Sequence, residues 1–496
     1  MEKELPKNWV FCPLDDLAKI QSGGTPARSN SSYWNGDIPW VKISDIKGLS
    51  VDRATEYITE KGLKNSSATI FPKGTILFTI FATIGRIGVL EIEATTNQAI
   101  AGITPSELIN KKYITYSLLE LSSSILSEGK GVAQKNINQT ILKNTLIPLP
   151  PLPEQTRIVA KLDRLFGQLE QIKESLDKIP QFLKDFRQQV LTQAVTGKLT
   201  AEWRELNKEY TTSLKVEKNT NFYLHPIPNG WIHTTIDNIG KVKGGKRLPK
   251  GHDLVDEDTG LPYIRARDLK QGSVLTENLR YLLPETQEKI KRYTVKENDL
   301  YITIVGAKIG DAGIIPFEMD GANLTENAAK ITDLEKGVDH DYLALWLQSS
   351  ICFENMMQSI KSAAQGKLAL TRIKELPVYI GSIEEQQEIV ARIKNLFAKA
   401  DAIEQQYQAL KQKIDTLPQA ILHKAFKGEL VPQMESDGDA RELLEEIKAL
   451  KKQTVKPIGK KKNFRVSAVK PLKKPKTYKV EEVELGRVAE EIKKYK

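Results

Sequence analysis

Two glycine loops that are rich in cations and hydroxyls have the residue types best suited to contact with a phosphate backbone. They read QSGGTPAR over residues 21–28 and KGGKRLPKG over residues 243–251 of the 496-residue chain. Backbone amides, hydroxyls and cationic side chains are the groups that proteins direct at phosphate oxygens. The candidate contact residues of these loops are Gly23, Gly24, Thr25, Arg28, Lys246, Arg247 and Lys250. The glycines have an equally good structural explanation, which is a turn that requires positive φ.

Further polar side chains recur at matching places in the two halves of the sequence. Arg, Lys, Gln and Asn can hydrogen-bond base edges in a DNA groove. The candidates outside the glycine loops are Lys42, Ser44, Arg86, Lys130, Gln134, Lys135, Arg265, Arg267, Lys308, Gln365 and Lys367. A single basic loop is more often simply solvated, so the prediction depends on the recurrence of these residues in both halves.

No catalytic or metal motif is recognisable in the sequence. It has no GxxxxGK[ST] phosphate loop and no Asn-Pro-Pro-aromatic motif, with which base-flipping amino methyltransferases hold their target amine. Five histidines are scattered without ligand spacing, and Cys12 and Cys352 are too few for a disulfide framework or a zinc site. Glu384 and Glu385 stand at a predicted helix start, where the helix dipole accounts for them. We therefore expect no catalytic residue, metal or cofactor in the chain itself.

Two long helices must position the candidate loops. EQTRIVAKLDRLF (residues 154–166) returns as EQQEIVARIKNLF 231 residues later (residues 385–397), and the register holds to residues 199 and 430. The apolar residues recur in alternating steps of four and three, which is the spacing of a coiled-coil seam. The predicted packing residues are Ile158, Leu162, Leu165, Leu169, Ile172, Ile389, Ile393, Leu396 and Ile403. Pro180 and Pro418 predict a kink or break. The alternative is two amphipathic helices packed on a globular core.

The segments before each helix are predicted to be compact α+β domains, since their short β-branched runs are bounded by Gly, Pro and Asp. We expect two globular domains in tandem repeat, at residues 1–150 and 226–380. The two repeated helices cover residues 151–199 and 381–430, and a polar linker covers 200–225. A duplication of this kind predicts a pseudo-two-fold axis, an antiparallel coiled coil of the two helices, and one domain at each end of it.

The positive charge of the chain is concentrated in its C-terminal region. The net charge is +10, yet residues 448–479 contain thirteen Lys or Arg and no Asp or Glu. We expect residues 431–496 to be a basic, disordered tail, either a non-specific nucleic-acid contact or only a solvated segment. The sequence has no apolar run long enough to span a membrane and no signal-peptide core, so a cytoplasmic location is expected.

The order of motifs resembles the specificity subunit of type I restriction-modification systems. The matching motifs are GGTP (23–26), YWNGDIPWV (33–41), IGRIG (84–88), NQAI (97–100), PLPPLPEQ (148–155) and TGKLTAEWR (196–204), and the resemblance extends to about residue 450. Several motifs are degraded in the second half, as where KGGKRLPKG replaces GGTP.

The resemblance implies two target-recognition domains, each of which reads one half of a bipartite, asymmetric double-stranded DNA site. It implies that the helices act as a spacer and dock two methyltransferase subunits, which bind S-adenosylmethionine and methylate adenine. Separate restriction subunits would act as ATP- and Mg²⁺-dependent motors. Two other hypotheses compete with this one: a stand-alone DNA-modifying enzyme with an unrecognised active site, and a coiled-coil scaffold that binds no DNA.

Overall fold

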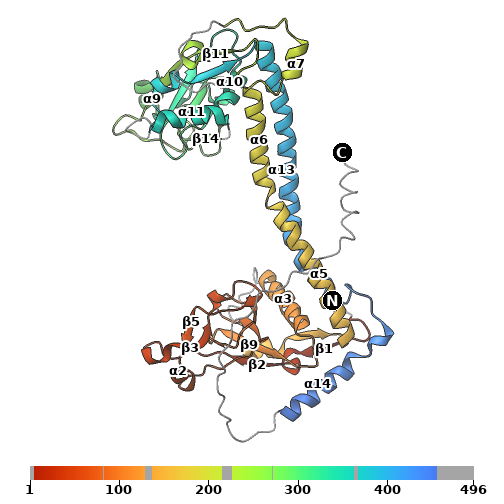
Figure 1. Cartoon of the computed structure of the whole chain (residues 1–496). Coiled ribbons are helices and arrows are strands. Elements are labelled where there is room, and N and C mark those ends of the chain that lie inside the picture. Colours follow the sequence, from red (N-terminus) through yellow and green to blue (C-terminus); the bar gives the residue numbers. More distant parts are fainter. Residues whose placement is uncertain are drawn as a thin grey trace.

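The protein has two globular domains at the two ends of a rod of helices (Figure 1). The computed structural model describes residues 5–81, 83–128, 137–214, 226–270, 272–361 and 367–454. The candidates Lys130, Gln134, Lys135 and Gln365, and the basic residues 455–496, lie outside the described residues. We call the globular parts domain 1 and domain 2, and the helices between them the rod. The chain is therefore mixed α/β, as the sequence predicts.

The rod contains α5 (Leu152–Leu176), α6 (Ile179–Val195) and α13 (Ile383–Phe426). α5 ends and α6 begins immediately before Pro180, whose ring and missing N–H interrupt a helix. The predicted break at this proline is confirmed. Pro418 lies inside α13, which continues through it without a break.

The rod helices run antiparallel. The end of α6 and the start of α13 both pack into the core of domain 2, whereas the start of α5 and the end of α13 pack into domain 1. Between the domains, Leu169 and Leu176 pack with Tyr407 and Ile414. Ion pairs join the helices along the same length, namely Lys173–Asp415, Asp177–Lys411 and Arg187–Asp401.

The middle of the rod fully buries only one of its two apolar stripes, and in the second stripe Ile179 packs partly buried at the α5–α6 break. Leu169 and Leu176 are 8% exposed, whereas Ile172 is 44% exposed and Ile403 is 49% exposed. The prediction that Ile172 and Ile403 pack between the helices is therefore wrong. Two helices can cover only a narrow stripe of each other, so the second apolar stripe faces outward. Leu410 and Leu417 follow Ile403 at seven-residue spacing, Phe186 lies fourteen residues after Ile172, and all three are also exposed.

The other predicted packing residues belong mainly to the domain junctions. Ile158 and Leu162 are buried in the core of domain 1, and Ile389 and Ile393 in that of domain 2. Leu396 packs partly buried against the core of domain 2, and Leu165 is half-buried. The helix ends therefore anchor the domains, while the middle of the rod holds the helices together.

Domain 1 is built on a five-stranded sheet of order β2-β9-β6-β7-β4 and a three-stranded sheet of order β5-β3-β8. Its strands are β1 (Val10–Pro13), β2 (Ala18–Ser22), β3 (Trp34–Val41), β4 (Ser50–Val51), β5 (Glu56–Ile58), β6 (Ile76–Thr79), β7 (Ile87–Leu90), β8 (Thr95–Thr96), β9 (Ile100–Pro105) and β10 (Leu146–Leu149). Its helices are α1 (Leu14–Leu17), α2 (Glu60–Lys64), α3 (Lys111–Glu128) and α4 (Gln139–Asn144), with short 3-10 turns at Ser31–Tyr33 and Ile43–Asp45. β1 pairs with β10, so the domain closes immediately before α5.

Domain 2 repeats this plan with a four-stranded sheet of order β12-β19-β16-β17. Its strands are β11 (Ile232–Thr235), β12 (Lys241–Gly244), β13 (Tyr263–Ile264), β14 (Leu269–Lys270), β15 (Ser273–Val274), β16 (Leu300–Thr303), β17 (Ala312–Ile314), β18 (Asn323–Leu324), β19 (Ala328–Thr332) and β20 (Pro377–Ile380). Its helices are α8 (Ile236–Ile239), α9 (Pro284–Ile290), α10 (His340–Leu347), α11 (Ser350–Lys361) and α12 (Leu370–Lys374), with a 3-10 turn at Phe317–Met319. β11 pairs with β20 immediately before α13, as β1 pairs with β10 before α5.

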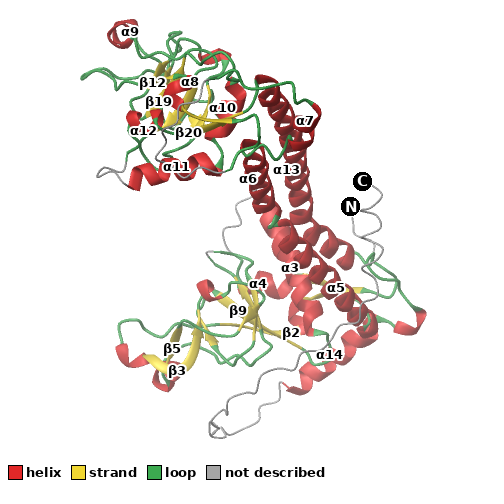
Figure 2. Cartoon of the chain, turned by 45° about the horizontal axis from the view of Figure 1, so that its top comes forward, coloured by secondary structure: helices red, strands yellow, loops and turns green. Residues whose placement is uncertain are grey.

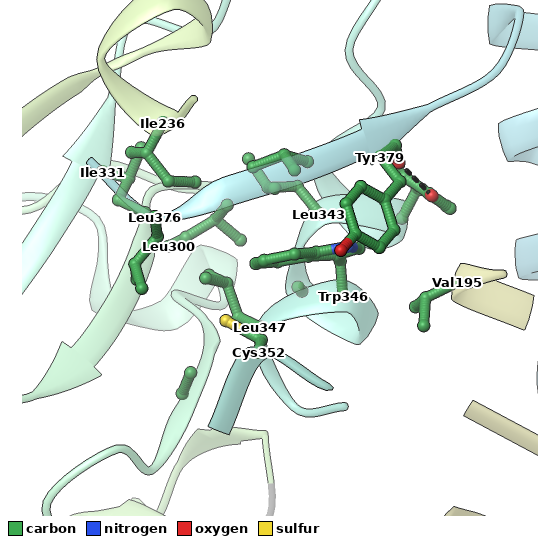
Figure 3. Close-up of a cluster of buried hydrophobic side chains, with 14 of the residues drawn as sticks. Val195, Ile236, Leu300, Ile331, Leu343, Trp346, Leu347, Cys352, Leu376 and Tyr379 are labelled. Atoms are coloured by element: carbon green, nitrogen blue, oxygen red, sulfur yellow. Dashed lines mark hydrogen bonds between the residues drawn. The ribbon is translucent and has the colours of Figure 1, made fainter. Parts of the chain in front are cut away.

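The core of domain 2 includes rod residues. Trp346 is fully buried at its centre, and Val195 of α6 reaches the same cluster from the rod side (Figure 3). Tyr342 donates a hydrogen bond from its hydroxyl to the carbonyl of Tyr379 at 2.6 Å. In domain 1, Tyr113 donates the equivalent hydrogen bond to Pro148 at 2.5 Å. In both domains the same hydrogen bond therefore joins a helix, α10 or α3, to the strand that precedes the rod helix, β20 or β10.

The first part of the predicted tail is ordered, which corrects the prediction of disorder from residue 431. A 3-10 turn (Glu435–Asp437) leads into α14 (Ala440–Thr454), and Ala440, Leu444 and Ile447 are buried in the core of domain 1. α14 forms because its apolar residues recur at helical spacing. α7 (Ala201–Leu206) follows the rod in the corresponding place at domain 2. None of the described helices is long and apolar enough to cross a membrane.

Candidate nucleic-acid interface

The glycines of the first loop are required by close packing. The Gly23 amide donates to the carbonyl of Ile100 at 3.0 Å, and the Gly24 amide donates to that of Thr96 at 2.8 Å. A Cβ atom on Gly24 would lie 2.3 Å from the backbone nitrogen of Ala68. Neither glycine has positive φ. Both amides are therefore used within the domain, and close packing rather than positive φ accounts for the two glycines. The predicted DNA contact of Gly23 and Gly24 remains a prediction.

The second loop follows the same design. The Gly245 amide donates to the carbonyl of Ala328 at 3.0 Å, and the Lys246 amide donates to that of Leu324 at 2.8 Å. An aromatic side chain fixes each loop from the neighbouring strand. The Trp40 indole donates to the carbonyl of Gly24 at 2.8 Å, and the Tyr263 hydroxyl donates to that of Lys246 at 2.8 Å. These hydrogen bonds hold the two loops against the sheet and use the amides of Gly23, Gly24, Gly245 and Lys246, so these four amides are not free for a ligand.

The side chains of domain 1 converge in one cluster, which we call the outer cluster of domain 1. Arg28 lies over the ring of Trp34, with 3.8 Å from its guanidinium carbon to the ring centroid. Its guanidinium pairs with Glu56, and Lys42 pairs with the other oxygen of Glu56 at 2.6 Å. These two cations hold the pKa of Glu56 below its ordinary value. Thr25 of the same loop donates a hydrogen bond to Gln98.

The outer cluster of domain 2 has the same position but different chemistry. Arg247 is largely exposed and pairs with Glu326 at 2.7 Å, and the Lys246 ammonium lies 5.5 Å from the ring centroid of Tyr293. Burial raises the pKa of the Glu326 carboxyl, but its hydrogen bonds, first of all that from Arg247, outweigh burial and hold the pKa below its ordinary value. Lys250 is exposed at the end of the loop. The two clusters share a framework and present different side chains.

Arg265 is a structural residue, which corrects its assignment to the interface. Its guanidinium makes a bidentate contact with Asp268, at 2.7 and 2.8 Å, and donates to the carbonyl of Asn278 at 2.6 Å. Its side chain is only 17% exposed. Arg267, by contrast, is 65% exposed and lines an open cavity of about 560 Å³ with Lys270 and Arg280. Arg267 remains available to a ligand.

A second group of candidates lies on the β6–β7 and β16–β17 loops. Arg86 is exposed and lines an open cavity of about 460 Å³ with Lys47. Lys308 is 53% exposed and lies 3.6 Å from Asp311. Lys367 is exposed next to Leu368, whose amide donates to the carbonyl of Ile304 at the end of β16. Ser44 is exposed as well but belongs to the turn after β3. Arg86 and Lys308 are therefore not part of the outer clusters.

The two domains lie on the same side of the rod, one at each end, and face one another along its length (Figures 1 and 2). α3 lies on the side of domain 1 that faces domain 2, and α11 lies on the side of domain 2 that faces domain 1. A duplex that extends from one domain to the other would therefore run alongside the rod. The described residues include no group of three or more His, Cys, Asp or Glu that could hold a metal ion.

Sequence reasoning missed the residues that fix the helix starts to the domains. Glu154 and Glu385 are buried, and each accepts a hydrogen bond from an indole nitrogen, of Trp9 at 3.0 Å and of Trp231 at 2.7 Å. Glu385 also accepts from Arg204 and Thr200, within TGKLTAEWR. The recurrence of Trp9 as Trp231 and of Glu154 as Glu385 was a usable signal, because a tryptophan and a carboxylate were repeated together.

Comparisons with known proteins place this architecture in a family. The model of the type I restriction modification DNA specificity domain matches residues 6–181 and 228–412. The chain is 34% identical over 455 residues to the EcoBI type I restriction enzyme specificity subunit of Escherichia coli, covering 89% of this chain and 92% of that one. The EcoKI specificity subunit of Escherichia coli K12 is 28% identical, with 90% and 96% covered.

Solved structures agree on the fold. The HsdS subunit of Thermoanaerobacter tengcongensis superimposes with a TM-score of 0.56 at 17% identity, covering 86% of this chain and 99% of that one. A chain from a structural study of complex assembly and conformational transition in a type I R-M system gives a TM-score of 0.59 with the same coverage and identity. The tandem domains, the helices between them and the family match agree: this chain belongs to the type I restriction-modification DNA specificity subunits, whose role is DNA sequence recognition.

Proposed function

We propose that each domain reads one half of a bipartite, asymmetric site in double-stranded DNA. The observation that carries the proposal is the outer cluster, which repeats one framework with different side chains. Trp40 and Tyr263 hold the two loops by equivalent hydrogen bonds to a loop carbonyl. The hydrogen bond from Thr25 to Gln98 in domain 1 is replaced in domain 2 by the contact of Arg247 with Glu326. Two rigid supports with different polar surfaces would read two different sequences, since base edges are distinguished by their donors and acceptors.

The loop cations Arg86, Lys308 and Lys367 would position the duplex. Their side chains are exposed, and phosphate contacts fix register and orientation without reading sequence. Lys130, Gln134, Lys135 and Gln365 remain proposed DNA contacts, of a residue type that can hydrogen-bond base edges. The outer clusters would then supply much of the sequence readout, together with Arg267 and Ser44.

The rod would act as the spacer between the half-sites and as the docking surface for two methyltransferase subunits. Its helices are proposed to form an antiparallel coiled coil around a pseudo-two-fold axis, which the ion pairs Lys173–Asp415 and Asp177–Lys411 support. The exposed stripe consists of Ile172, Phe186, Ile403, Leu410 and Leu417. An apolar stripe of this length on a helix pair suits additional helices. A pseudo-two-fold axis would relate two equivalent copies of this stripe on the rod, and each copy would dock one methyltransferase subunit.

The chain would contribute recognition and assembly, and no chemistry of its own. In this proposal S-adenosylmethionine, ATP and Mg²⁺ are bound by the partner methyltransferase and restriction subunits. Methylation of duplex DNA by the purified chain with S-adenosylmethionine and no partner would overturn this assignment.

Exchange of one domain tests the half-site proposal. The segment from Trp9 to Leu149 is replaced by the corresponding segment of a relative with a different methylated motif, and the cell's methylated sites are sequenced. β1 and β10 close the domain at these positions, so the exchange preserves the junction with α5. One half of the motif should change while the other half stays. A change in both halves, or in neither, would contradict the proposal.

A further inference from the structure

The two domains dock on the rod through equivalent helices. In domain 1, the amide of Asn110 donates to the side-chain oxygen of Gln155 on α5 at 3.1 Å, just before α3. In domain 2, the amide of Asp339 donates to the side-chain oxygen of Gln386 on α13 at 2.9 Å, just before α10. These hydrogen bonds put α3 and α10 in the same register on their rod helices, so the residues that follow can be compared one by one.

The first ion pair of each junction has opposite polarity in the two halves. Lys112 of α3 pairs with Asp163 of α5 at 2.6 Å. At the corresponding positions of domain 2, Asp341 of α10 pairs with Lys394 of α13, also at 2.6 Å. The domain thus carries the cation in one half and the anion in the other, and the rod helix carries the matching charge.

The contact one turn further along differs as well. Tyr116 donates a hydrogen bond to the free oxygen of Asp163 at 2.5 Å, and its ring lies 5.5 Å from that of Phe166. Leu345 takes the place of Tyr116 in domain 2 and has no hydroxyl to donate. There, Leu345 and Phe397 line a cavity of about 330 Å³ beside the ion pair. Domain 2 thus has a cavity at the place where Tyr116 of domain 1 contacts Asp163 and Phe166.

We propose that Lys112–Asp163 and Asp341–Lys394 form a charge code that assigns each recognition domain to its own rod helix. If domain 2 docked on α5, Asp341 would meet Asp163 and the Tyr116 hydrogen bond would be lost. If domain 1 docked on α13, Lys112 would meet Lys394. Because the framework contacts are the same in both halves, they tolerate either pairing, and the reversed charges discriminate between them.

This code bears on which domains can be exchanged. In a tandem repeat a domain can also dock on the wrong rod helix, either in its own chain or in a second copy of the chain. Such a wrong pairing would bury the same apolar residues. A foreign domain fits the first position when it carries a cation at the place of Lys112, and fits the second when it carries an anion at that of Asp341. Moving a domain from one position to the other then requires a change on the rod helix.

The test uses one substitution in two backgrounds. In the native chain, Asp163→Lys places a lysine opposite Lys112 and should lower the midpoint of thermal unfolding by about 2–4 °C. In a chain whose Trp9–Leu149 segment is replaced by Trp231–Ile380, the residue from Asp341 lies opposite Asp163. There Asp163→Lys should raise the midpoint, because it restores the pairing found at Lys394. Calorimetry of the full chain measures both shifts.

Two further variants complete the design. The native Lys112→Asp/Asp163→Lys double variant should recover at least half of the loss, which keeps the proposal testable if the grafted chain does not fold. Asp415→Lys, which breaks the ion pair with Lys173 in the middle of the rod, is the matched control and should shift both chains in the same direction. A loss from Asp163→Lys in both backgrounds, or a double variant no more stable than Asp163→Lys, would overturn the charge code. Neither result depends on DNA binding.

Discussion

The indole nitrogen of Trp231 lies 2.7 Å from Oε2 of Glu385, and it fixes the first turn of α13 to the first residues of domain 2. The other carboxylate oxygen accepts from Arg204 and Thr200, which follow the end of α6. One buried carboxylate therefore joins the end of one rod helix, the start of the other and the globular domain. Trp9, Glu154 and Gln433 form the corresponding contact at domain 1.

Removal of this carboxylate should destabilise the chain strongly. Glu385→Ala leaves the Arg204 guanidinium, which is 18% exposed, without its partner, and the loss should be about 3–5 kcal/mol. Glu384→Ala is the matched control, because Glu384 is the adjacent carboxylate and is only half-buried. Urea unfolding followed by circular dichroism measures both. A Glu385→Ala loss no larger than that of the control would contradict the anchoring role.

The glycine loop should be intolerant of side chains for a steric reason. Gly24→Ala would place its Cβ atom 2.3 Å from the backbone of Ala68, so the loop must move. The expected cost is about 1–3 kcal/mol, together with weaker DNA binding. Gly48→Ala is the control, because a Cβ atom there meets no neighbour within 4 Å. Equal unfolding free energies for the two variants would refute the packing explanation.

Arg86 is the best single probe of phosphate contact in domain 1. Arg28 and Lys42 both pair with Glu56, so their reversal would also disturb the outer cluster. Arg86→Glu should weaken binding of duplex DNA and reduce the slope of log affinity against log salt by about 1. Reversal of Lys460, in the basic tail, should have a smaller effect, since neighbouring cations can replace it. Fluorescence anisotropy across a salt series measures both, and equal losses would place the interface elsewhere.

The free energy of unfolding should decrease at acidic pH because the carboxylate of Asp437 becomes protonated. Its carboxylate makes a bidentate pair with Arg157, at 2.7 and 2.6 Å, which holds the pKa of Asp437 below its ordinary value of 3.8. A depressed carboxyl pKa adds stability that is present above the unfolded-state value and is lost as the pH falls through the folded-state value. Asp437→Asn should lower stability at pH 7 and flatten its decline below about pH 4. Glu435→Gln, an exposed neighbour, should leave the profile unchanged, and a matching change in both variants would contradict the assignment.

The length of the rod should set the spacer between the half-sites. One heptad inserted after Leu176 and another after Tyr407 adds about 10 Å of helix, and keeps Leu176 and Ile414 in their stripes. The unspecified spacer should lengthen by up to about three base pairs, less any part absorbed by DNA deformation. Both half-site sequences should stay the same. Sequencing of methylated sites measures this, and an active variant with an unchanged spacer would show that the rod does not set the distance.

Much of the fold could be predicted because the repeat is visible in the sequence. The regular apolar steps predict α5, α6 and α13, and Pro180 predicts the break. The heptad pattern could not show that Ile172 and Ile403 face outward, because it gives the apolar positions and not the number of helices that cover them. α14 was missed because the charge of the basic region obscured Ala440, Leu444 and Ile447, whose burial depends on the surface of domain 1.

The site was less predictable than the fold. Gly23 and Gly24 were predicted as contact residues, whereas the structure shows that they are needed for close packing against Thr96 and Ala68, which approach from distant parts of the chain. Arg265 is a cation of the type that contacts DNA. Its guanidinium, however, pairs with the carboxylate of Asp268 and donates to the carbonyl of Asn278, which leaves it largely buried. A sequence lists the cations but not which carboxylates have already paired with them.

The break between α5 and α6 gives the rod an unequal bending stiffness. One side of the rod is the continuous α13, and the other is jointed at Asp177 and Lys178. A pair of helices in which one is interrupted bends most easily at the interruption, and the uninterrupted helix limits the size of the bend. Leu176 and Ile414 pack beside the joint and hold the two sides in contact. A bend at Asp177 and Lys178 would change the angle between the two domains, while each domain kept its own anchoring contacts with the rod.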